Sequence, residues 1–246
     1  MKETEIKYLS GFFDADGWAC FVYNSGYLHL EVGIEQAEST DRDGAYINSL
    51  KNKLGGSVSH RQREATWSPT NTWRLCVRSD LEKLLPRLIK HCVIKGKHLQ
   101  RLLAVYRDMK GVKIDRELFE VYQEYCQESR SDSGPVKPKN HPTWAWLAGY
   151  LDGDGYYMMR KRPRQTECRV GVVAHEDDVE TLMWLKESFG GVVKDRKDCR
   201  AYEWVRNIGP RDKSFAVNFL TKIVRFHPMK KWKIEQILNF HSTRND

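Results

Sequence analysis

Residues 9–17 read LSGFFDADG, and residues 147–155 read LAGYLDGDG. The two stretches lie at an offset of 138 residues, from 9 to 147, and each ends in Asp-x-Asp-Gly. A helix that is apolar nearly all round must be buried. The small pairs Ser10-Gly11 and Ala148-Gly149 remove side-chain bulk, so two such helices can approach closely. This packing would bring together two C-terminal carboxylates, which is unfavourable unless a cation lies between them.

The repeated motif resembles the nine-residue sequence that gives the LAGLIDADG homing endonucleases their name. Two copies in one chain resemble the monomeric, pseudo-two-fold members of that family. An ordinary buried helix ending in an Asp-Gly turn would explain one copy, but not two that open similar half-chains. A calcium loop needs a Gly at its sixth position and further oxygen ligands. Here Gly17 and Gly155 come at the fourth position, before apolar and aromatic residues.

Composition limits the class of protein. The chain has 246 residues, enough for one large domain or two of roughly 120. Its hydrophobic content of 40% can supply a core, and its net charge of +8 favours a polyanionic partner. No apolar run is long enough to span a membrane. The acidic residues near Met1 do not fit a signal peptide.

The cysteines indicate the compartment. All 6 are scattered, and none forms a Cys-x-x-Cys pair. This spacing predicts reduced thiols rather than a zinc site or a disulfide framework. We therefore expect an intracellular protein that is not secreted, either in a prokaryotic cytoplasm or in an organelle such as a chloroplast or mitochondrion.

The second half of the chain repeats the first. Each half reads as helix, strand, strand, helix, strand, strand, helix, helix, so the fold class is α+β. We expect an N-terminal half at 1–128, a polar linker at 129–142 containing two prolines, and a C-terminal half at 143–246. The resemblance implies two pseudo-symmetric αββαββα(α) halves packed through the motif helices, whose antiparallel four-stranded sheets form a DNA-binding saddle.

The last acid of each motif is the candidate metal ligand. Hydrolysis of a phosphodiester needs a nucleophilic water and positive charge in the transition state, and divalent ions held by carboxylates provide both. The resemblance implies that Asp16 and Asp154 bind Mg²⁺, for which Mn²⁺ can substitute. It also implies the backbone carbonyls of Ala15 and Gly153 as further ligands.

The earlier acids, Asp14 and Asp152, are expected to have a structural role at the helix ends. A carboxylate at a helix C-terminus opposes the helix dipole. Asp16 and Asp154 are therefore unfavourable without a cation, which favours a functional role for them.

A lysine before the last helix of each half is the second candidate. The segments 94–103 and 229–238 align their apolar positions at an offset of 135, which places Lys95 over Lys230. The resemblance implies that a lysine here contacts active-site solvent and the scissile phosphate. A solvated lysine at a helix start is the alternative, and Lys97, Lys231 and Lys233 are the fallback candidates.

A glutamine is the third candidate. Gln36 follows Gly17 by 19 residues, at the end of the second strand. The resemblance implies that a glutamine here orients water around the metal. The same count from Gly155 reaches Ala174, so the second half departs from the pattern. Either His175 or Glu176 substitutes, or the two half-sites are chemically unequal.

Basic residues in the strands are the candidate DNA contacts. Alternation along a strand places Arg61 and Arg63 on one face, and Arg74 and Arg78 are expected in the next strand, residues 72–78. Arginine binds guanine edges in a bidentate manner, although each residue alone could equally contact phosphate or solvent. The full set is Arg61, Arg63, Arg74, Arg78, Arg160, Arg162, Arg164, Arg169, Lys194, Arg196 and Arg206.

These features predict a site-specific, metal-dependent endonuclease. The resemblance implies a monomer that binds a long, nearly asymmetric double-stranded DNA site, cuts both strands with 3′ overhangs and serves intron homing. An RNA-binding intron maturase and a non-cleaving DNA-binding protein are the alternatives on the same fold. Both alternatives tolerate loss of the motif acids, whereas this chain keeps them.

Overall fold

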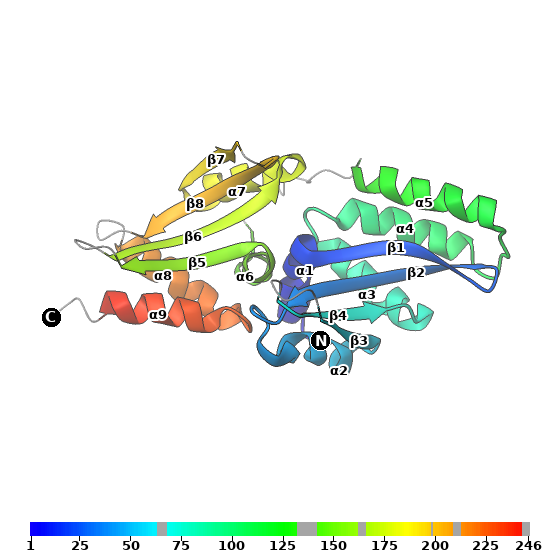
Figure 1. Ribbon diagram of the computed structural model, residues 1–246, viewed down its shortest axis with the longest axis horizontal. Coiled ribbons are helices and arrows are strands. Elements are labelled where there is room, and N and C mark those ends of the chain that lie inside the picture. The colour runs from blue at the N-terminus through cyan, green and yellow to red at the C-terminus, as the bar shows by residue number, and fades with distance from the viewer. Residues whose placement is uncertain (63–67, 132–141, 162–165, 198, 209–212, 243–246) are drawn as a thin grey trace. The chain divides into compact units, whose positions relative to one another are not determined.

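The computed structural model describes residues 1–62, 68–131, 142–161, 166–197, 199–208 and 213–242 (Figure 1). The first half of the chain contains α1 (Glu3–Asp16), β1 (Gly17–Asn24), β2 (Tyr27–Ala37), α2 (Ala45–Leu54), β3 (Ser57–Arg61), β4 (Thr70–Leu75), α3 (Arg78–His91), α4 (Gly96–Asp108) and α5 (Arg116–Ser131). The second half contains α6 (Trp144–Gly153), β5 (Gly155–Lys161), β6 (Thr166–His175), α7 (Val179–Phe189), β7 (Val192–Arg196), β8 (Ala201–Ile208), α8 (Lys213–Ile223) and α9 (Lys231–Ser242). Short 3₁₀ helices lie at Arg42–Gly44, Glu176–Asp178 and Val224–Phe226.

Each half forms a four-stranded antiparallel sheet with the same topology. The strand orders are β1-β2-β4-β3 and β5-β6-β8-β7. The registers also match, since Gly17 lies opposite Ile34 and Gly155 lies opposite Val172, each partner displaced by the same offset. The predicted α+β fold with two similar halves is therefore confirmed.

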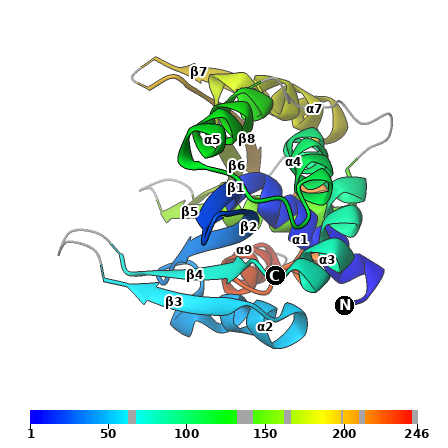
Figure 2. The same ribbon diagram turned by 90° about the vertical axis from the view of Figure 1, so that its right-hand side faces the viewer.

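Helices cover one face of each sheet and leave the other face open. Along β2 the side chains of Leu30, Val32 and Ile34 are fully buried, whereas their alternating neighbours are mostly partly exposed. Trp73 of β4 donates to Gly55 O at 2.9 Å and thereby fixes the end of α2, which lies along β3 and β4 (Figure 2). The alternation follows from the period of a strand, and the hydrophobic face forms the core.

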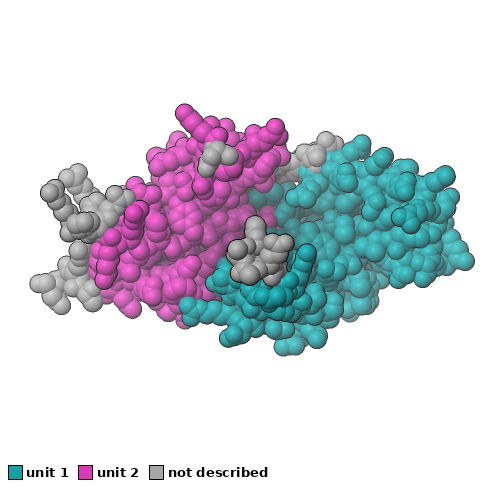
Figure 3. All heavy atoms as spheres, in the orientation of Figure 1, with its two compact units in different colours: residues 1–6, 16–136 teal, residues 7–15, 137–246 magenta. Residues whose placement is uncertain are grey.

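The chain divides into two compact units (Figure 3). One comprises residues 1–6 and 16–136, and the other comprises residues 7–15 and 137–246. Most of α1 therefore belongs to the same unit as α6. The predicted division at 129–142 follows chain order and stays a prediction; α5 extends into it, and residues 132–141 lie outside the described ranges.

The two motif helices approach closely at their glycines. A Cβ atom on Gly11 would overlap the carbonyl oxygen of Trp146, and one on Gly149 would overlap the carbonyl oxygen of Tyr8. Ser10 and Ala148, the other small residues of the motifs, are fully buried. The contact expected from the two small pairs is confirmed.

The strand predicted at 72–78 is shorter than expected. β4 ends at Leu75, and Arg78 is the first residue of α3. Asp80 in the first turn of α3 interacts favourably with the positive end of the helix dipole, which supports an early helix start. The placement of Arg78 in a strand was wrong.

All 6 cysteines lie within the described ranges, and none of them takes part in a disulfide there. Burial, with a smaller effect from Glu31, raises the pKa of the Cys20 thiol to about 11, so this thiol stays protonated. Within the described ranges, no helix has the length and apolar character needed to cross a membrane.

Candidate functional site

The first acid of each motif has a structural role. Asp14 is 3% exposed and accepts a hydrogen bond from Trp146 Nε1 at 2.9 Å. Asp152 is 0% exposed and accepts one from Tyr8 Oη at 2.7 Å. Tyr8 and Trp146 occupy equivalent positions of the two motifs, so each helix is tied to the buried acid of the other. These contacts agree with the expected role and leave Asp16 and Asp154 as the candidate chemical acids.

Three candidate residues converge at the C-terminal end of α1. Asp16, the last residue of the helix, accepts a hydrogen bond from Gln36 Nε2 at 2.9 Å. Gln36 Oε1 accepts one from Ala37 N at 2.9 Å, so the orientation of the amide is fixed. Lys95 Nζ donates to Gly17 O at 2.7 Å, near the negative end of the helix dipole. The resemblance to the family implied a carboxylate, an amide and a lysine at this site.

The second half-site contains a different arrangement. Asp154 is exposed at the end of α6, and Lys230 is 5% exposed. Lys230 Nζ donates to the carbonyl oxygens of Leu151 at 2.8 Å, Gly153 at 3.1 Å and Gly155 at 2.6 Å. The carbonyl of Gly153, expected as a metal ligand, therefore already accepts a hydrogen bond from lysine.

The position that matches Gln36 is apolar in the second half. Ala174 is buried, and no polar side chain replaces the glutamine at this position. His175 Nδ1 lies 3.0 Å from Asp177 Oδ2 within its own turn, and Glu176 is exposed in the same turn. The observed contact of His175 is thus local, and the geometry favours two chemically unequal half-sites.

The second half-site also contains a buried histidine, His227, which the sequence did not predict. His227 Nδ1 lies 2.8 Å from Asp152 Oδ1, and both side chains are fully buried. His227 Nε2 and Tyr157 Oη are 2.9 Å apart. Burial, followed by the charge of Asp152, raises the pKa of Tyr157 well above its ordinary value, so this hydroxyl keeps its proton. The apolar spacing of β5 gave no sign that Tyr157 would have a polar partner.

The open face of the first sheet carries two of the predicted arginines. Arg61 lies opposite Thr70, and Arg74 lies opposite both Gly33 and Ser57. Arg61 is exposed, and the Arg74 side chain is 52% exposed. Arg74 is 3.8 Å from Glu31, which holds the guanidinium beside the sheet. Arg63 lies outside the described ranges.

Arg78 lies away from the sheet surface. Its Nη2 donates to Tyr106 O at 2.8 Å, and its guanidinium lies over the Tyr106 ring at 4.3 Å. Its Nε donates to Glu82 Oε1 at 3.0 Å. These contacts tie the start of α3 to the end of α4, so the structure does not group Arg78 with Arg74.

The open face of the second sheet carries four predicted basic residues. The registers place the following on that face: Arg160, Arg169, Lys194 and Arg196. Arg169 Nε donates to Glu167 Oε1 at 2.6 Å. Arg206 lies on the covered face, opposite Val170, where its Nη1 donates to Phe189 O at the end of α7. Arg162 and Arg164 lie outside the described ranges.

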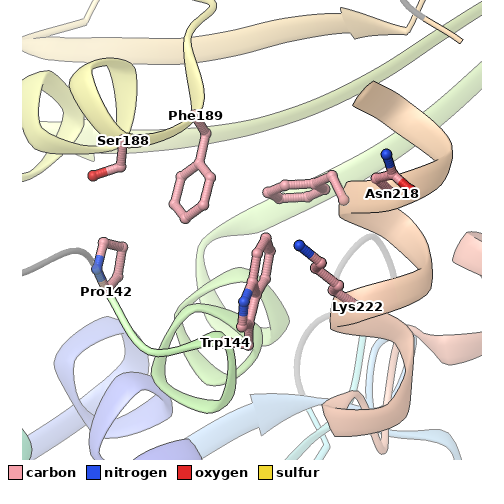
Figure 4. Close-up of a pocket in the computed structure, with 7 residues that line it drawn as sticks. Pro142, Trp144, Ser188, Phe189, Asn218 and Lys222 are labelled. Atoms are coloured by element: carbon pink, nitrogen blue, oxygen red, sulfur yellow. The ribbon is translucent and has the colours of Figure 1, made fainter. Parts of the chain in front are cut away.

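An open pocket of about 440 Å³ lies at the N-terminal end of α6 (Figure 4). The rings of Trp144, Phe189 and Phe219 pack with centroids 5.4 to 5.5 Å apart. Lys222 Nζ lies 5.6 Å from the centroid of the Trp144 ring. The aromatic cluster packs α6 against α7 and α8, so we assign it to stability.

The donor set fits a hard divalent cation. Among the described residues, no group of three or more His, Cys, Asp and Glu side chains is arranged to hold a metal. Each half-site instead offers one carboxylate, from Asp16 or Asp154, beside backbone carbonyls. Mg²⁺ keeps several waters and is commonly bound by one or two carboxylates plus substrate phosphates. The donor set therefore suits a hard divalent cation.

Comparison with known proteins identifies the fold. No protein-family model matches the sequence. The LAGLIDADG homing endonuclease I-GzeII, solved with its DNA target, matches with a TM-score of 0.72 and 13% identity over 97% of this chain and 91% of that chain. The meganuclease I-SmaMI, bound to uncleavable DNA, matches with a TM-score of 0.69 and 17% identity over 100% and 93%. The LAGLIDADG meganuclease I-AabMI, bound to uncleaved DNA, matches with a TM-score of 0.67 and 14% identity over 97% of this chain and 92% of that chain.

The chain has the fold of the LAGLIDADG homing endonucleases. The match covers both sheets and both motif helices, as the duplicated motif predicted. The individual roles of Asp16, Gln36, Lys95, Asp154 and Lys230 stay predictions.

Proposed function

We propose that this protein is a site-specific endonuclease that cuts both strands of a double-stranded DNA target. In this proposal it acts as a monomer, uses Mg²⁺, leaves 3′ overhangs and initiates intron homing. The observation that carries the proposal is the convergence of Asp16, Gln36 and Lys95 at the end of α1. I-GzeII and I-AabMI were solved bound to DNA. I-SmaMI was solved bound to cleaved DNA and, in a separate structure, bound to an uncleaved target in the presence of calcium ions.

The chemistry proposed is hydrolysis of a phosphodiester. A water oxygen attacks phosphorus, the bond to the leaving oxygen breaks, and that oxygen takes up a proton. Mg²⁺ held by Asp16 in the first half-site, and by Asp154 in the second, would supply positive charge against the extra negative charge of the transition state. Gln36 holds the carboxylate of Asp16 in one orientation through its 2.9 Å hydrogen bond. Lys95 adds a positive charge beside the same carboxylate-bearing helix end.

The open sheet faces supply the proposed DNA surface. Six described basic residues lie on them: Arg61, Arg74, Arg160, Arg169, Lys194 and Arg196. Their guanidinium and ammonium groups suit phosphate contacts and, for arginine, bidentate contacts with guanine. Glu31 and Glu167, which pair with Arg74 and Arg169, add acceptors that suit cytosine.

Cleavage of a randomised duplex library tests the proposal. The purified protein is incubated with Mg²⁺, and the ends of the products are sequenced. Discrete products with 3′ overhangs are expected, and they should vanish with EDTA. Asp16→Asn and Asp154→Asn keep the side-chain shape and remove the charge, so both should lose cleavage by a factor of about 100 or more.

Two controls make the result decisive. Asp195→Asn, an exposed acid at the end of β7, should cut like the parent protein. Both motif variants should still bind the target, because they leave the sheet faces unchanged. A parent protein that binds duplex DNA but never cuts it with Mg²⁺ or Mn²⁺ would contradict the proposal and favour a DNA-binding regulator. Binding to intron RNA without cleavage of DNA would favour a maturase.

A further inference from the structure

We propose that the aromatic residue that follows each motif is a positioning residue for sequence recognition, because it crosses a glycine of the neighbouring strand and holds a charged side chain on the open face of the sheet. In the second sheet Tyr156 holds Glu203 for a base with an exocyclic amine, above all cytosine. In the first sheet Trp18 holds Arg74 for guanine. The inference rests on the proposed function, since it names residues that select the DNA target.

Tyr156 lies across the second sheet on its open face. In this sheet β6 lies between β5 and β8 (Figure 1). Tyr156 of β5 is opposite Gly171 of β6. A Cβ atom on Gly171 would lie only 2.6 to 2.7 Å from Cζ, Cε1 and Oη of Tyr156. The lack of a side chain at Gly171 therefore lets the tyrosine ring cross β6 and reach β8.

The hydroxyl of Tyr156 holds the carboxylate of Glu203 on β8. Tyr156 Oη donates to Glu203 Oε1 at 2.7 Å. Burial, followed by this hydrogen bond, raises the pKa of Tyr156 well above its ordinary value, so the hydroxyl keeps its proton and acts as the donor. A glutamate side chain that is ordered before binding loses less rotamer freedom when it meets a base. Glu203 is partly exposed, and its carboxylate has further acceptor sites for a base.

The charge of Glu203 decides which part of DNA it suits. The registers place Arg169 and Lys194 on the same face as Glu203, and both suit phosphate. A carboxylate on this basic face repels phosphate, whereas it accepts a hydrogen bond from N4 of cytosine. A hydrogen bond that fixes the carboxylate therefore favours contact with a base edge rather than with the DNA backbone.

The first sheet contains the same arrangement with a different charged group. Trp18 is opposite Gly33, and Gly33 is opposite Arg74. A Cβ atom on Gly33 would overlap the Trp18 ring. Arg74 Cζ lies 5.8 Å from the centroid of that ring, and Arg74 Nη1 lies 3.8 Å from Glu31 Oε1. An aromatic ring attracts a guanidinium over its face within about 6 Å. The ring and the acid together hold Arg74 for bidentate contact with guanine.

The duplication keeps the support and changes what it holds. Trp18 and Tyr156 lie at the offset of 138 that separates the motifs, and so do Gly33 and Gly171. The charged group is an arginine in one sheet and a glutamate in the other. A nearly asymmetric DNA target requires such unlike contacts from two similar sheets.

Selection of bound duplexes from a randomised pool, with EDTA present and Mg²⁺ omitted, tests the inference without cleavage. The parent protein should favour cytosine at one position that depends on Glu203. Glu203→Gln should lower this preference by a factor of about 10 and shift it toward adenine. Tyr156→Phe keeps the ring and removes the hydroxyl, so it should lower the preference at the same position by a factor of about 3.

Two further variants separate positioning from packing in the second sheet. Gly171→Ala displaces the ring of Tyr156 and should weaken the preference at the same position as Tyr156→Phe does. Tyr202→Phe is the matched control, because Tyr202 precedes Glu203 in β8 and lies on the other face, opposite Ala174. This control should keep every preference of the parent protein.

The first sheet is tested in the same selection. Arg74→Lys should lower a preference for guanine at another position by a factor of about 10. Trp18→Leu should lower the preference at that same position by a factor of about 3. Loss of packing alone would weaken binding to every sequence alike, so a change confined to the position that depends on Arg74 is the evidence for positioning.

The outcomes distinguish this inference from the endonuclease proposal. The inference is overturned if Tyr156→Phe keeps the parent preferences, if its effect spreads over all positions, or if no position depends on Glu203. If Gly171→Ala or Trp18→Leu does not fold, Tyr156→Phe and Glu203→Gln decide alone. A protein that binds with these preferences but never cuts with Mg²⁺ contradicts the endonuclease proposal and supports the inference. A protein that binds no duplex DNA contradicts both.

Discussion

The smallest residues of the motif have the largest structural consequence. Gly11 and Gly149 face the backbones of Trp146 and Tyr8, so neither position has room for a Cβ atom. The neighbour in each case is a carbonyl oxygen of a helix, which cannot move aside as a flexible side chain can. The motif helices can therefore pack this closely only because both positions are glycine, which has a hydrogen atom where alanine has a methyl group.

Gly11→Ala should destabilise the protein strongly. We expect a loss of about 3 kcal/mol in the free energy of unfolding, at the upper end of the usual cost of overpacking. Gly111→Ala is the matched control: a Cβ there meets nothing within 4 Å, but the backbone has a φ of +74°. That variant should lose only about 1 kcal/mol. Denaturant unfolding measures both, and equal losses would show that the motif helices can separate without cost.

A buried histidine should give the stability a pH dependence. His98 is 5% exposed, and burial lowers its pKa below the ordinary value of 6.5, against a hydrogen bond to the Ala19 backbone. As the pH falls below 6.5, the unfolded chain binds a proton that the folded chain does not, so stability decreases. His98→Gln should flatten this part of the curve of unfolding free energy against pH.

The matched control for His98 is an exposed histidine. His175→Gln, at a surface position, controls for the exchange of histidine for glutamine when the free energy of unfolding is measured between pH 5 and 7. A parent protein whose unfolding free energy does not change over this range, or a His98→Gln variant with the parent slope, would show that His98 titrates alike in both states.

Single residues of the site could be predicted where the chemistry repeats along the chain. Asp16 and Lys95 were named from the repeat together with the resemblance to the family, and Gln36 from the resemblance at a position that does not repeat; the structure places all three around one helix end. His227 and Tyr157 were missed because their contact joins distant parts of the chain. A histidine before a helix and a tyrosine in a strand have no spacing in common, so only packing shows that they meet.

At the scale of the element, the position of an arginine on a strand decides what it does. Arg196 of β7 is exposed on the open face, whereas Arg206 of β8 lies on the covered face and donates to Phe189 O. A cation at the C-terminal end of α7 satisfies a carbonyl that the helix leaves unpaired. The position of Arg206 therefore suits a helix cap, and the DNA contact expected of it stays a prediction.

Replacing each arginine by alanine should change a different property of the protein. Arg206→Ala should lower the free energy of unfolding by about 2 kcal/mol, because the last turn of α7 loses a hydrogen bond from a charged group. Arg196→Ala should change it by no more than about 0.5 kcal/mol and should weaken DNA binding instead. Thermal unfolding and DNA titration of both variants separate the two effects. Weaker DNA binding by Arg206→Ala at unchanged stability would contradict this assignment.

The alternation of apolar and polar residues predicted the strands well, but it predicted the ends of the elements less well. β2 runs over the residues that alternate most clearly, with a turn at Ser25 and Gly26 whose φ values of 53° and 82° suit a tight hairpin. The strand predicted at 72–78 does not reach Arg78, because the local sequence is compatible both with a strand and with the start of a helix. Which of the two forms depends on the contacts that Arg78 makes with α4, and these are not encoded nearby.

At the scale of the whole molecule, one architecture carries two unequal halves. The sheets share their order and the register of their first two strands, so the duplication is kept in the backbone of the sheets, although α5 has no counterpart among the described residues of the second half. The side chains differ where chemistry is expected: Gln36 is matched by Ala174, and Cys92 by His227. Fold symmetry is set by packing, which tolerates such changes, whereas equality of the two half-sites would require each polar group to be kept.

The last prediction concerns how both sheets bind DNA together. A protein that neutralises phosphates releases counterions, so its affinity falls with salt by a slope of about 0.9 per phosphate contacted. Removing Arg61 and Arg74 together, or Arg160 and Arg196 together, should lower this slope by roughly one to two and weaken binding in each case. Removing all four should add the two effects, because the pairs lie on separate sheets.

The matched control for these variants is Arg116→Ala. Its side chain is 85% exposed on α5, so it carries the same charge away from either sheet. Titration of the target duplex at several salt concentrations, with DNA held uncut by omission of Mg²⁺, measures every variant. The Arg116 variant should keep the parent slope, because counterions are released only where the protein touches the backbone of DNA. An equal loss for Arg116→Ala would mean that binding follows the net charge of +8 rather than the open faces of the sheets.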